Sequence, residues 1–364
     1  MIPKGKRMKR FLALLLAVVC MLSVFGCGKK STLGDDSLDT NADGTVKELK
    51  SKDMYNFLVM GHDRQASLTD VVMLVSYDTK EGTMAIMQLP RDTYIEVENN
   101  TYHKLNGLYN HCVAKARDEE STNPQRDGCR KAADYLADAL GIKIHYSAVM
   151  DLDGFGAIVD AIGGVYMYVP YTLEYSDSSQ NLNIDLQEGY NTLDGDEAEQ
   201  FVRYRSGFAN ADIGRGDAQK MFMTAFLESF KKNVSISNIG EIANAIVKNV
   251  ETDMKLRQII KIGTSLISIE LSDITMMTLP GEACMSGGVS YYVMNKELLC
   301  GVLSDHFNIY VDELSSESVD KNSIFCNEND SNMLSVYEKP GDEVHFEKHN
   351  AQDISDEDIY IPLK

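Results

Sequence analysis

The chain has 364 residues and a formal net charge of −20, with 55 acidic against 35 basic side chains. This balance argues against nucleic acid as a partner, because a surface that binds a phosphate backbone must be basic. Any anionic ligand would have to be held by a local cluster of cations, since the overall field of the protein repels it.

Residues 1–26 have the layout of a secretory signal peptide. A basic segment that contains Arg7 and Arg10 precedes an apolar stretch from Phe11 to Val24. This stretch is short for a membrane-spanning helix, which needs about 20 residues. We therefore expect export across a membrane.

The stretch ends in Val24-Phe25-Gly26-Cys27, which is similar to a bacterial lipobox. In that interpretation Cys27 is acylated and becomes the new N-terminus; the alternative is an uncleaved signal anchor. Both interpretations predict a protein attached to the extracellular face of the cell membrane, in contact with membrane lipid.

Five further cysteines follow Cys27. An exported protein can form disulfides, and Cys112 and Cys129 flank a polar loop, so they are the candidate pair. Because five is odd, at least one thiol would remain outside any intramolecular pair. The cysteine and histidine spacing does not indicate a zinc site.

The predicted elements, in chain order, begin after a polar, flexible spacer at residues 27–52. Apolar runs predict strands, and helical periodicity or helix-entry residues predict helices. The predicted order is strands at 55–60, 71–77 and 83–89, helices at 106–117 and 128–140, a strand at 146–150, a helix at 152–162, a strand at 165–169, a polar stretch, helices at 194–205, 212–232, 236–248 and 256–267, strands at 274–279 and 289–294, and a helix at 295–307.

Strands and helices alternate along the chain, which predicts an α/β (or α+β) sheet covered by helices. Residues 53–310 are numerous enough for one well-buried domain. Residues 311–364 are acidic and lack periodicity, so we expect a mobile tail or a loosely packed extension.

Four short charged clusters follow predicted strands or helices. They are Gly61-His62-Asp63-Arg64 with Asp70, Pro90-Arg91-Asp92-Thr93, Lys104-Leu105-Asn106, and Arg203-Tyr204-Arg205 followed by Asp212, Arg215 and Gln219. Taken singly, each cluster is explained as well by a structural role, because Asp favours turns and caps and Arg favours helix C-termini.

Together the clusters suit the handling of a phosphate ester. The arginine guanidinium binds phosphate oxygens through two parallel hydrogen bonds. Mg²⁺ needs one or two carboxylates and takes water and phosphate oxygens as its other ligands. Asp63 and Asp70 are candidates for such a cation, because two adjacent strands could bring them together.

The ordered set of motifs resembles the LytR-CpsA-Psr family of cell-wall enzymes. Besides the four clusters, the resemblance includes Gly163-Gly164-Val165, Leu193-Asp194-Gly195, and more weakly Leu279-Pro280-Gly281 and Ser290-Tyr291-Tyr292. The resemblance implies a central mixed β-sheet flanked by helices, with an apolar channel for a prenyl chain. The implied activity is transfer of a glycopolymer, such as a teichoic acid, a capsular polymer or another secondary wall polymer, from a polyprenyl-pyrophosphate carrier to a sugar hydroxyl of peptidoglycan through a phosphodiester.

The resemblance also implies roles for individual residues. Asp63 and Asp70 would hold Mg²⁺, and the catalytic set would be Arg91, Asp92, Arg203, Arg205 and Asp212, in which the two aspartates orient arginines or act as the base. Lys104, Asn106, Arg215, Gln219 and Arg64 would bind substrate. Two alternatives use the same arginines: a regulatory protein that only binds the polyprenyl carrier, and a pyrophosphatase in which water replaces the sugar.

Overall fold

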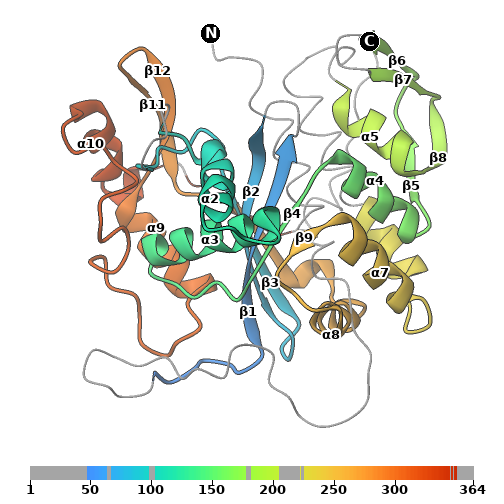
Figure 1. Cartoon of the computed structure of the whole chain (residues 1–364), viewed down its shortest axis with the longest axis horizontal. Coiled ribbons are helices and arrows are strands. Elements are labelled where there is room, and N and C mark those ends of the chain that lie inside the picture. The colour runs from blue at the N-terminus through green and yellow to red at the C-terminus, as the bar shows by residue number, and fades with distance from the viewer. Residues whose placement is uncertain are drawn as a thin grey trace.

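The computed structural model describes residues 47–63, 67–97, 103–177, 182–204, 222, 225–344, 346 and 348–350. Within these residues a seven-stranded sheet forms the centre of the molecule, and helices cover both of its faces (Figure 1). The predicted α/β class and the mixed sheet flanked by helices are confirmed.

The central sheet has the strand order β13-β10-β3-β2-β1-β4-β9. Its strands are β1 (Met54–Asp63), β2 (Leu68–Asp78), β3 (Thr83–Leu89), β4 (Tyr146–Met150), β9 (Glu251–Thr252), β10 (Ile274–Thr278) and β13 (Lys348–Asn350). Strands β1, β2 and β3 form an antiparallel meander, whereas β4 runs parallel to β1 and β10 runs parallel to β3. The inner strands are buried on both faces, which explains their nearly continuous apolar sequences.

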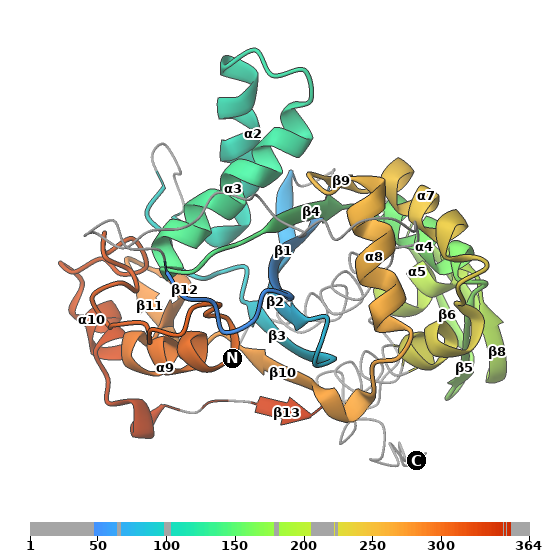
Figure 2. The same ribbon diagram turned by 90° about the horizontal axis from the view of Figure 1, so that it is seen from below.

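Alternate residues of the inner strands enter two separate apolar clusters. Phe57 and Val59 face one cluster, and Leu58 and Met60 face the other. The first cluster is covered by α4 (Leu152–Ala161), α5 (Gly195–Arg203), α7 (Ile239–Asn249) and α8 (Leu256–Leu266). The second is covered by α2 (Leu108–Asp118), α3 (Pro124–Leu140), α9 (Lys296–His306) and α10 (Ser331–Tyr337). Figure 2 shows these two groups of helices on opposite sides of the sheet.

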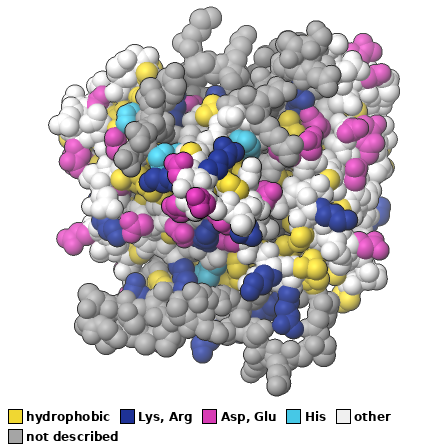
Figure 3. Space-filling view, viewed as in Figure 1, with side chains coloured by type: hydrophobic (Ala, Val, Ile, Leu, Met, Phe, Trp, Pro, Cys, Tyr) yellow, Lys and Arg dark blue, Asp and Glu magenta, His cyan; other side chains and the backbone are white. Residues whose placement is uncertain are grey.

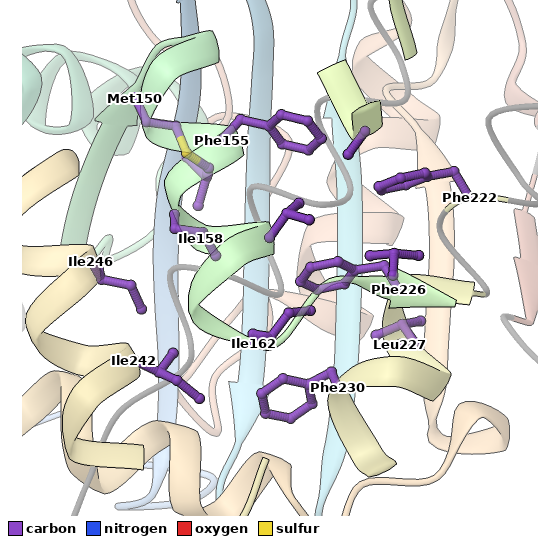
Figure 4. Packing of buried hydrophobic residues seen from close by; sticks show 14 of the residues in the cluster. Met150, Phe155, Ile158, Ile162, Phe222, Phe226, Leu227, Phe230, Ile242 and Ile246 are labelled. Carbon is purple, nitrogen blue, oxygen red and sulfur yellow. The ribbon is translucent and has the colours of Figure 1, made fainter. Parts of the chain in front are cut away.

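Aromatic side chains fill the first cluster beside α4 (Figure 4). Phe222, Phe226 and Phe230 recur at every fourth position, which places them on one face of a helix, and all three are buried. The ring of Phe222 lies 6.1 Å from that of Phe155 on α4. The space between the sheet and these helices is therefore strongly apolar.

Three two-stranded ribbons flank the central sheet. They are β5 (Val165–Val169) with β8 (Gly189–Leu193), β6 (Leu173–Asp177) with β7 (Leu182–Leu186), and β11 (Gly281–Ser286) with β12 (Val289–Met294). The sequence predicted no strand in the polar stretch after residue 169, but β6, β7 and β8 lie there. Leu173, Ile184 and Leu186 are buried there. These few apolar side chains are enough to pack the ribbon against the helices.

The spacer prediction fails for its last residues. Leu49 pairs with Tyr310, the N–H of Lys50 donates to Ile309 O at 2.8 Å, and the N–H of Val311 donates to Glu48 O at 2.9 Å. This segment therefore packs on the domain through backbone pairing, which does not depend on apolar side chains. Residues 27–46 lie outside the described residues.

The prediction of a mobile or loosely packed tail after residue 310 is also wrong for the residues that the structure describes there, 311–344, 346 and 348–350. Phe325 and Met333 are buried, and β13 pairs with β10 at the edge of the central sheet. The buried carboxylate of Asp320 accepts the N–H of Ile324 at 2.7 Å and the hydroxyl of Tyr337 at 2.9 Å. The segment is ordered by a few buried residues that are spread too widely to produce a periodic sequence.

Cys112 and Cys129 are not joined by a disulfide, which corrects the predicted pair. Both are thiols buried in the second apolar cluster. The close approach of α2 and α3 is made by their neighbours instead, since a Cβ on Gly128 would lie 2.6 Å from Val113 Cγ2. Burial raises the pKa of the Cys112 thiol to about 11, so it stays protonated at neutral pH.

In the part of the chain that the structure describes, every helix is too short or too polar to cross a bilayer. The predicted signal peptide and Cys27 lie outside that part.

Candidate active site

Several of the charged residues singled out in the sequence lie at one end of the central sheet. Asp63 ends β1, Asp70 lies near the start of β2, and Arg91 and Asp92 follow β3. In the β2–β3 ladder Val72 pairs with Leu89, and continuing that antiparallel register by two residues brings Asp70 opposite Arg91. The structure confirms this contact: Arg91 Nη1 donates to Asp70 Oδ1 at 3.0 Å.

A β-bulge aims Asp70 at Arg91. Gly61 pairs with Val71, but the next residue, His62, pairs with Thr69, so Asp70 is an extra residue on β2. A bulge bends its strand and turns the side chain of the extra residue. Here it releases Asp70 from pairing with β1 and leaves its carboxylate beside the residue that follows β3.

The ion pair continues into a chain of alternating charges. Arg91 Nε lies 3.5 Å from Asp92 Oδ2, and Lys104 Nζ lies 2.9 Å from Asp92 Oδ1. We call Asp70, Arg91, Asp92 and Lys104 the charged chain. Its side chains are mostly shielded from solvent, so the attractions within it are screened less than those of surface ion pairs.

Backbone hydrogen bonds hold the charged chain in place. The N–H of Asn106 donates to Arg91 O at 3.0 Å, and the N–H of Leu105 donates to Thr93 O at 2.9 Å. The hydroxyl of Thr69 donates to Asn106 O at 3.1 Å, which ties this loop to β2. Asn106 thus takes part through its backbone, and the substrate-binding role of its side chain stays a prediction.

Two aromatic residues line the lysine end of the charged chain. Lys104 Nζ lies 5.4 Å from the centre of the Tyr291 ring, which makes an edge contact with Tyr94. Burial raises the pKa of both tyrosines above that of an exposed tyrosine. Both rings are therefore neutral at physiological pH, and Lys104 meets a ring face of the kind that attracts cations.

Arg203 comes from a different part of the fold. It ends α5, a helix that begins with a capping box formed by Asp194 and Glu197. Glu199, one turn earlier, accepts a hydrogen bond from Arg203 Nη1 at 2.6 Å. This (i, i+4) pair fixes the arginine on the face of α5 that carries Glu199.

The remaining predicted residues are not all open to structural description. Arg64, Arg205, Asp212, Arg215 and Gln219 lie outside the described residues. Their roles stay predictions. Of the predicted set, the structure brings together Asp70, Arg91, Asp92 and Lys104.

The sequence-based set omitted several contributors. Glu199 could have been found from its four-residue spacing to Arg203. Tyr292 contributes through its backbone: its N–H donates to Asp92 O, and its carbonyl accepts the N–H of Tyr94, both at 2.9 Å. The Ser290-Tyr291-Tyr292 motif pointed to this segment but not to its place beside Asp92.

The donor set at the strand ends suits a hard cation only when a phosphate supplies further ligands. Among the described residues, His, Cys, Asp and Glu form no group of three or more that could hold a metal ion. Asp63 and Asp70 provide two carboxylates at neighbouring strand ends. Two carboxylates with water and phosphate oxygens fit the coordination of Mg²⁺.

The distribution of surface charge indicates that anions are attracted by local groups of cations and not by the overall charge of the protein. On the face shown in Figure 3, the coloured basic side chains lie among acidic ones and do not form a continuous basic surface. An anionic group would therefore be recognised by individually placed arginines and lysines.

Comparison with known proteins supports one assignment. The LytR_cpsA_psr family model matches residues 24–343. A relative named polyisoprenyl-teichoic acid–peptidoglycan teichoic acid transferase TagU, from Oceanobacillus iheyensis, is 26% identical over 279 residues, which cover 76% of this chain and 82% of the relative.

Two solved structures share the fold. The crystal structure of Bacillus subtilis TagV has a TM-score of 0.52 at 22% identity and covers 70% of this chain and 98% of its own. The structure described as TagT bound to LI-WTA has a TM-score of 0.51 at 21% identity, with 78% and 96% covered. The family match spans most of the chain and includes every strand of the charged site: the chain belongs to the LytR_cpsA_psr family.

Proposed function

We propose that this protein transfers a glycopolymer, such as a teichoic acid, a capsular polymer or another secondary wall polymer, from a polyprenyl-pyrophosphate carrier to a sugar hydroxyl of peptidoglycan. The observation that carries the proposal is the charged chain, in which a bulge and two backbone ladders fix Arg91 between two carboxylates. The family membership and the teichoic acid transferase name of the relative support the same substrates.

The reaction is a phosphoryl transfer. The acceptor hydroxyl oxygen forms a bond to the phosphorus that carries the polymer, and the bond from that phosphorus to the bridging oxygen breaks. Polyprenyl phosphate leaves with the bonding electrons, and the hydroxyl proton passes to a base. Catalysis of such a step depends mainly on positioning and on neutralising the charge of the diphosphate.

Arg91 and Arg203 would bind the diphosphate. Asp70 and Asp92 orient the Arg91 guanidinium, and Glu199 orients that of Arg203. Charges that are held in place before substrate arrives stabilise a transition state without reorganising during the reaction. Lys104 would add a cation at the other side of Asp92.

Asp92 fits an orienting role better than that of a base. Its two carboxylate oxygens each contact a cation, Arg91 Nε on one side and Lys104 Nζ on the other. A carboxylate whose two oxygens are both held by cations serves to position those cations. We assign proton removal to Asp212, in line with the role that the resemblance implies.

Asp63 and Asp70 would hold Mg²⁺, which when bound would neutralise charge on the diphosphate. The apolar layer between the sheet and α4 would accommodate the prenyl chain of the carrier (Figure 4). Cys27 would attach the protein to the membrane through a lipid, or an uncleaved signal anchor would do so instead. Either attachment would keep this site at the outer surface of the membrane, where such a carrier lies.

The test measures products from a polyprenyl-pyrophosphate-linked oligosaccharide with and without peptidoglycan oligomers. Arg203→Ala and Asp63→Ala should abolish Mg²⁺-dependent formation of the phosphodiester product. Arg126→Ala is a matched control, because Arg126 forms an exposed ion pair with its neighbour Asp127.

Three outcomes would contradict the proposal. Transfer at the unmodified rate in both variants would remove the arginine and the carboxylate from the mechanism. Release of polyprenyl phosphate without any peptidoglycan product would replace the transferase by a pyrophosphatase, and binding without either product would leave a carrier-binding protein.

A further inference from the structure

The ribbon of β5 and β8 presents three exposed tyrosines on its outer face. Tyr166, Tyr168 and Tyr190 have exposed fractions of 52%, 40% and 70%. The other face of β5 is buried against the helices through Val165, Met167 and Val169. Figures 1 and 2 both show this ribbon at the outer edge of the helical layer, on the side away from the central sheet.

The three rings form one continuous surface. Tyr168 lies opposite Tyr190 in the ladder, and Tyr166 lies diagonally to Tyr190. The rings of Tyr166 and Tyr190 are stacked, with centroids 5.5 Å apart and planes 13° apart, and Tyr168 meets Tyr190 edge-on at 5.1 Å. We call these residues the tyrosine platform. Single exposed apolar residues are ordinary, whereas a contiguous exposed group marks a binding surface.

Stabilisation of the ribbon does not account for all three rings. One aromatic cross-strand pair, that of Tyr168 and Tyr190, supplies the contact that a short ribbon needs. Tyr166 pairs with Thr192 in the ladder, and its ring reaches diagonally across the ribbon to stack on Tyr190.

The charges around the platform exclude some classes of ligand. The outward residues Tyr166, Tyr168, Tyr190 and Thr192 include no carboxylate, although the chain as a whole carries a net charge of −20. Lys232 contributes a cation, with its Nζ 5.8 Å from the Tyr166 ring. One cation is too few for a polyphosphate chain, which is recognised by several cations or arginine forks.

Flat rings with hydroxyl groups at their edges suit pyranose sugars. The C–H faces of a pyranose pack on an aromatic plane, while its hydroxyls exchange hydrogen bonds with tyrosine and threonine hydroxyls. Because Tyr190 stacks on Tyr166 and meets Tyr168 edge-on, the exposed parts of the three rings offer a sugar both an aromatic plane and hydroxyl groups. A glycan strand of linked pyranoses therefore fits the platform better than a linear polyol phosphate does.

The platform also has a direct connection to the site. Strand β8 ends at Leu193, Asp194 caps α5, and α5 ends at Arg203. At 1.5 Å per residue this helix spans roughly 13 Å. We propose that the tyrosine platform binds the glycan strand of peptidoglycan and holds the acceptor near the transfer site. The acceptor role rests on the proposed function, but binding to the glycan does not.

The test is co-sedimentation of the full chain with peptidoglycan sacculi stripped of teichoic acid, in the absence of any polyprenyl donor. The double variant Tyr166→Ala/Tyr190→Ala should bind at least about tenfold more weakly, because it removes two adjacent aromatic contacts. Tyr190→Phe keeps the ring and should bind within about threefold of the unmodified protein. Met285→Ala, an exposed apolar residue on the β11–β12 ribbon, is the matched control and should have no effect.

Sacculus binding by the double variant equal to that of the unmodified protein would overturn the proposal. The proposal would also be overturned if the double variant lost binding to vesicles of phosphatidylglycerol and phosphatidylcholine while its sacculus binding stayed unchanged. That result would identify a membrane-binding surface, because tyrosines also favour membrane interfaces. Arg203→Ala should keep sacculus binding. If the platform variants lose that binding while no form of the protein transfers polymer, the proposed function fails and the platform stands.

Discussion

The charged chain and the tyrosine platform are tied to the fold in opposite ways. The charged chain joins β2, β3 and the loop before α2, and its aspartates and cations contact one another in a mostly shielded place. The tyrosine platform lies on the outward face of a two-stranded ribbon. The inward residues of this ribbon pack against the helices and hold the ribbon in place.

The difference has consequences for substitution. A residue of the charged chain supports both the local structure and the proposed chemistry, so its replacement should lower stability and activity together. A platform residue contacts mainly its own neighbours and solvent, so its replacement should lower binding alone. Variants that violate this separation would show that one of the two regions has been misassigned.

Within the charged chain, the largest effect is expected for Arg91→Ala. Loss of the guanidinium should lower the rate of transfer by at least about 100-fold, as removal of a positioned charge-stabilising donor does in other enzymes. It should also lower the free energy of unfolding by about 1–3 kcal/mol, because the partly buried carboxylates of Asp70 and Asp92 lose their contacts with the guanidinium. Steady-state kinetics and urea unfolding measure the two effects.

Arg91→Lys sharpens this prediction. The lysine keeps the charge but lacks the planar fork that contacts Asp70 and Asp92 together. It should recover part of the stability and little of the transfer rate. Full recovery of both would mean that charge alone matters at this position.

Gly195→Ala tests whether the placement of α5, which connects the ribbon of the tyrosine platform to Arg203, matters for transfer. A Cβ on Gly195 would overlap the backbone carbonyl oxygen of Gly156 in α4, so one of the helices must shift. Overpacking of this kind costs about 1–3 kcal/mol of stability. Because Arg203 ends the same helix, the transfer rate should fall by roughly tenfold.

Gly240→Ala on α7 is the control, since a Cβ there meets open space. An unchanged transfer rate in Gly195→Ala, with reduced stability, would show that the placement of α5 is not critical to Arg203.

The sheet was largely predictable because its strands carry unbroken apolar runs. Thr83–Leu89 and Tyr146–Met150 have the predicted bounds, since turns or helices border these runs closely. The ribbon strands β6 and β7 escaped prediction because isolated residues such as Leu173 and Ile184 are buried among polar neighbours. The segment after residue 310 escaped for the same reason: its anchoring residue Phe325 has no periodic companions.

The site was predictable in content but not in arrangement. Asp70 and Arg91 stand near strand ends, so their approach followed from an antiparallel meander. The bulge that frees Asp70 has no sequence signal beyond Gly61, and the placing of Tyr292 beside Asp92 depends on a contact between segments 200 residues apart. Long-range contacts of this kind arise from tertiary packing, which local sequence does not encode.

A smaller effect is expected for Glu199→Gln. The glutamine keeps the size of the side chain but removes the charge that holds Arg203, so the arginine samples more orientations. A helical (i, i+4) ion pair contributes about 0.5 kcal/mol, which corresponds to a two- to threefold fall in the transfer rate.

The fall for Glu199→Gln should appear in kcat/KM while sacculus binding stays unchanged. Glu241→Gln, an exposed glutamate on α7, should change neither quantity. A fall as large as that of Arg203→Ala would show that Glu199 does more than orient the arginine.

The smallest effect on stability is expected for Tyr190→Ala, although it should weaken sacculus binding. The Tyr190 ring is the most exposed of the three platform rings. Its aromatic contacts are with Tyr166, on which it stacks, and with Tyr168, which it meets edge-on. Surface substitutions of this kind change the free energy of unfolding by about 0.5 kcal/mol or less.

Urea unfolding of Tyr190→Ala beside Val165→Ala, its buried counterpart on the other face of the ribbon, measures the contrast. The valine variant should lose roughly 1–3 kcal/mol through its cavity. A tyrosine variant as unstable as the valine variant would mean that the exposed rings hold the ribbon together, and the case for a binding surface would lose its basis.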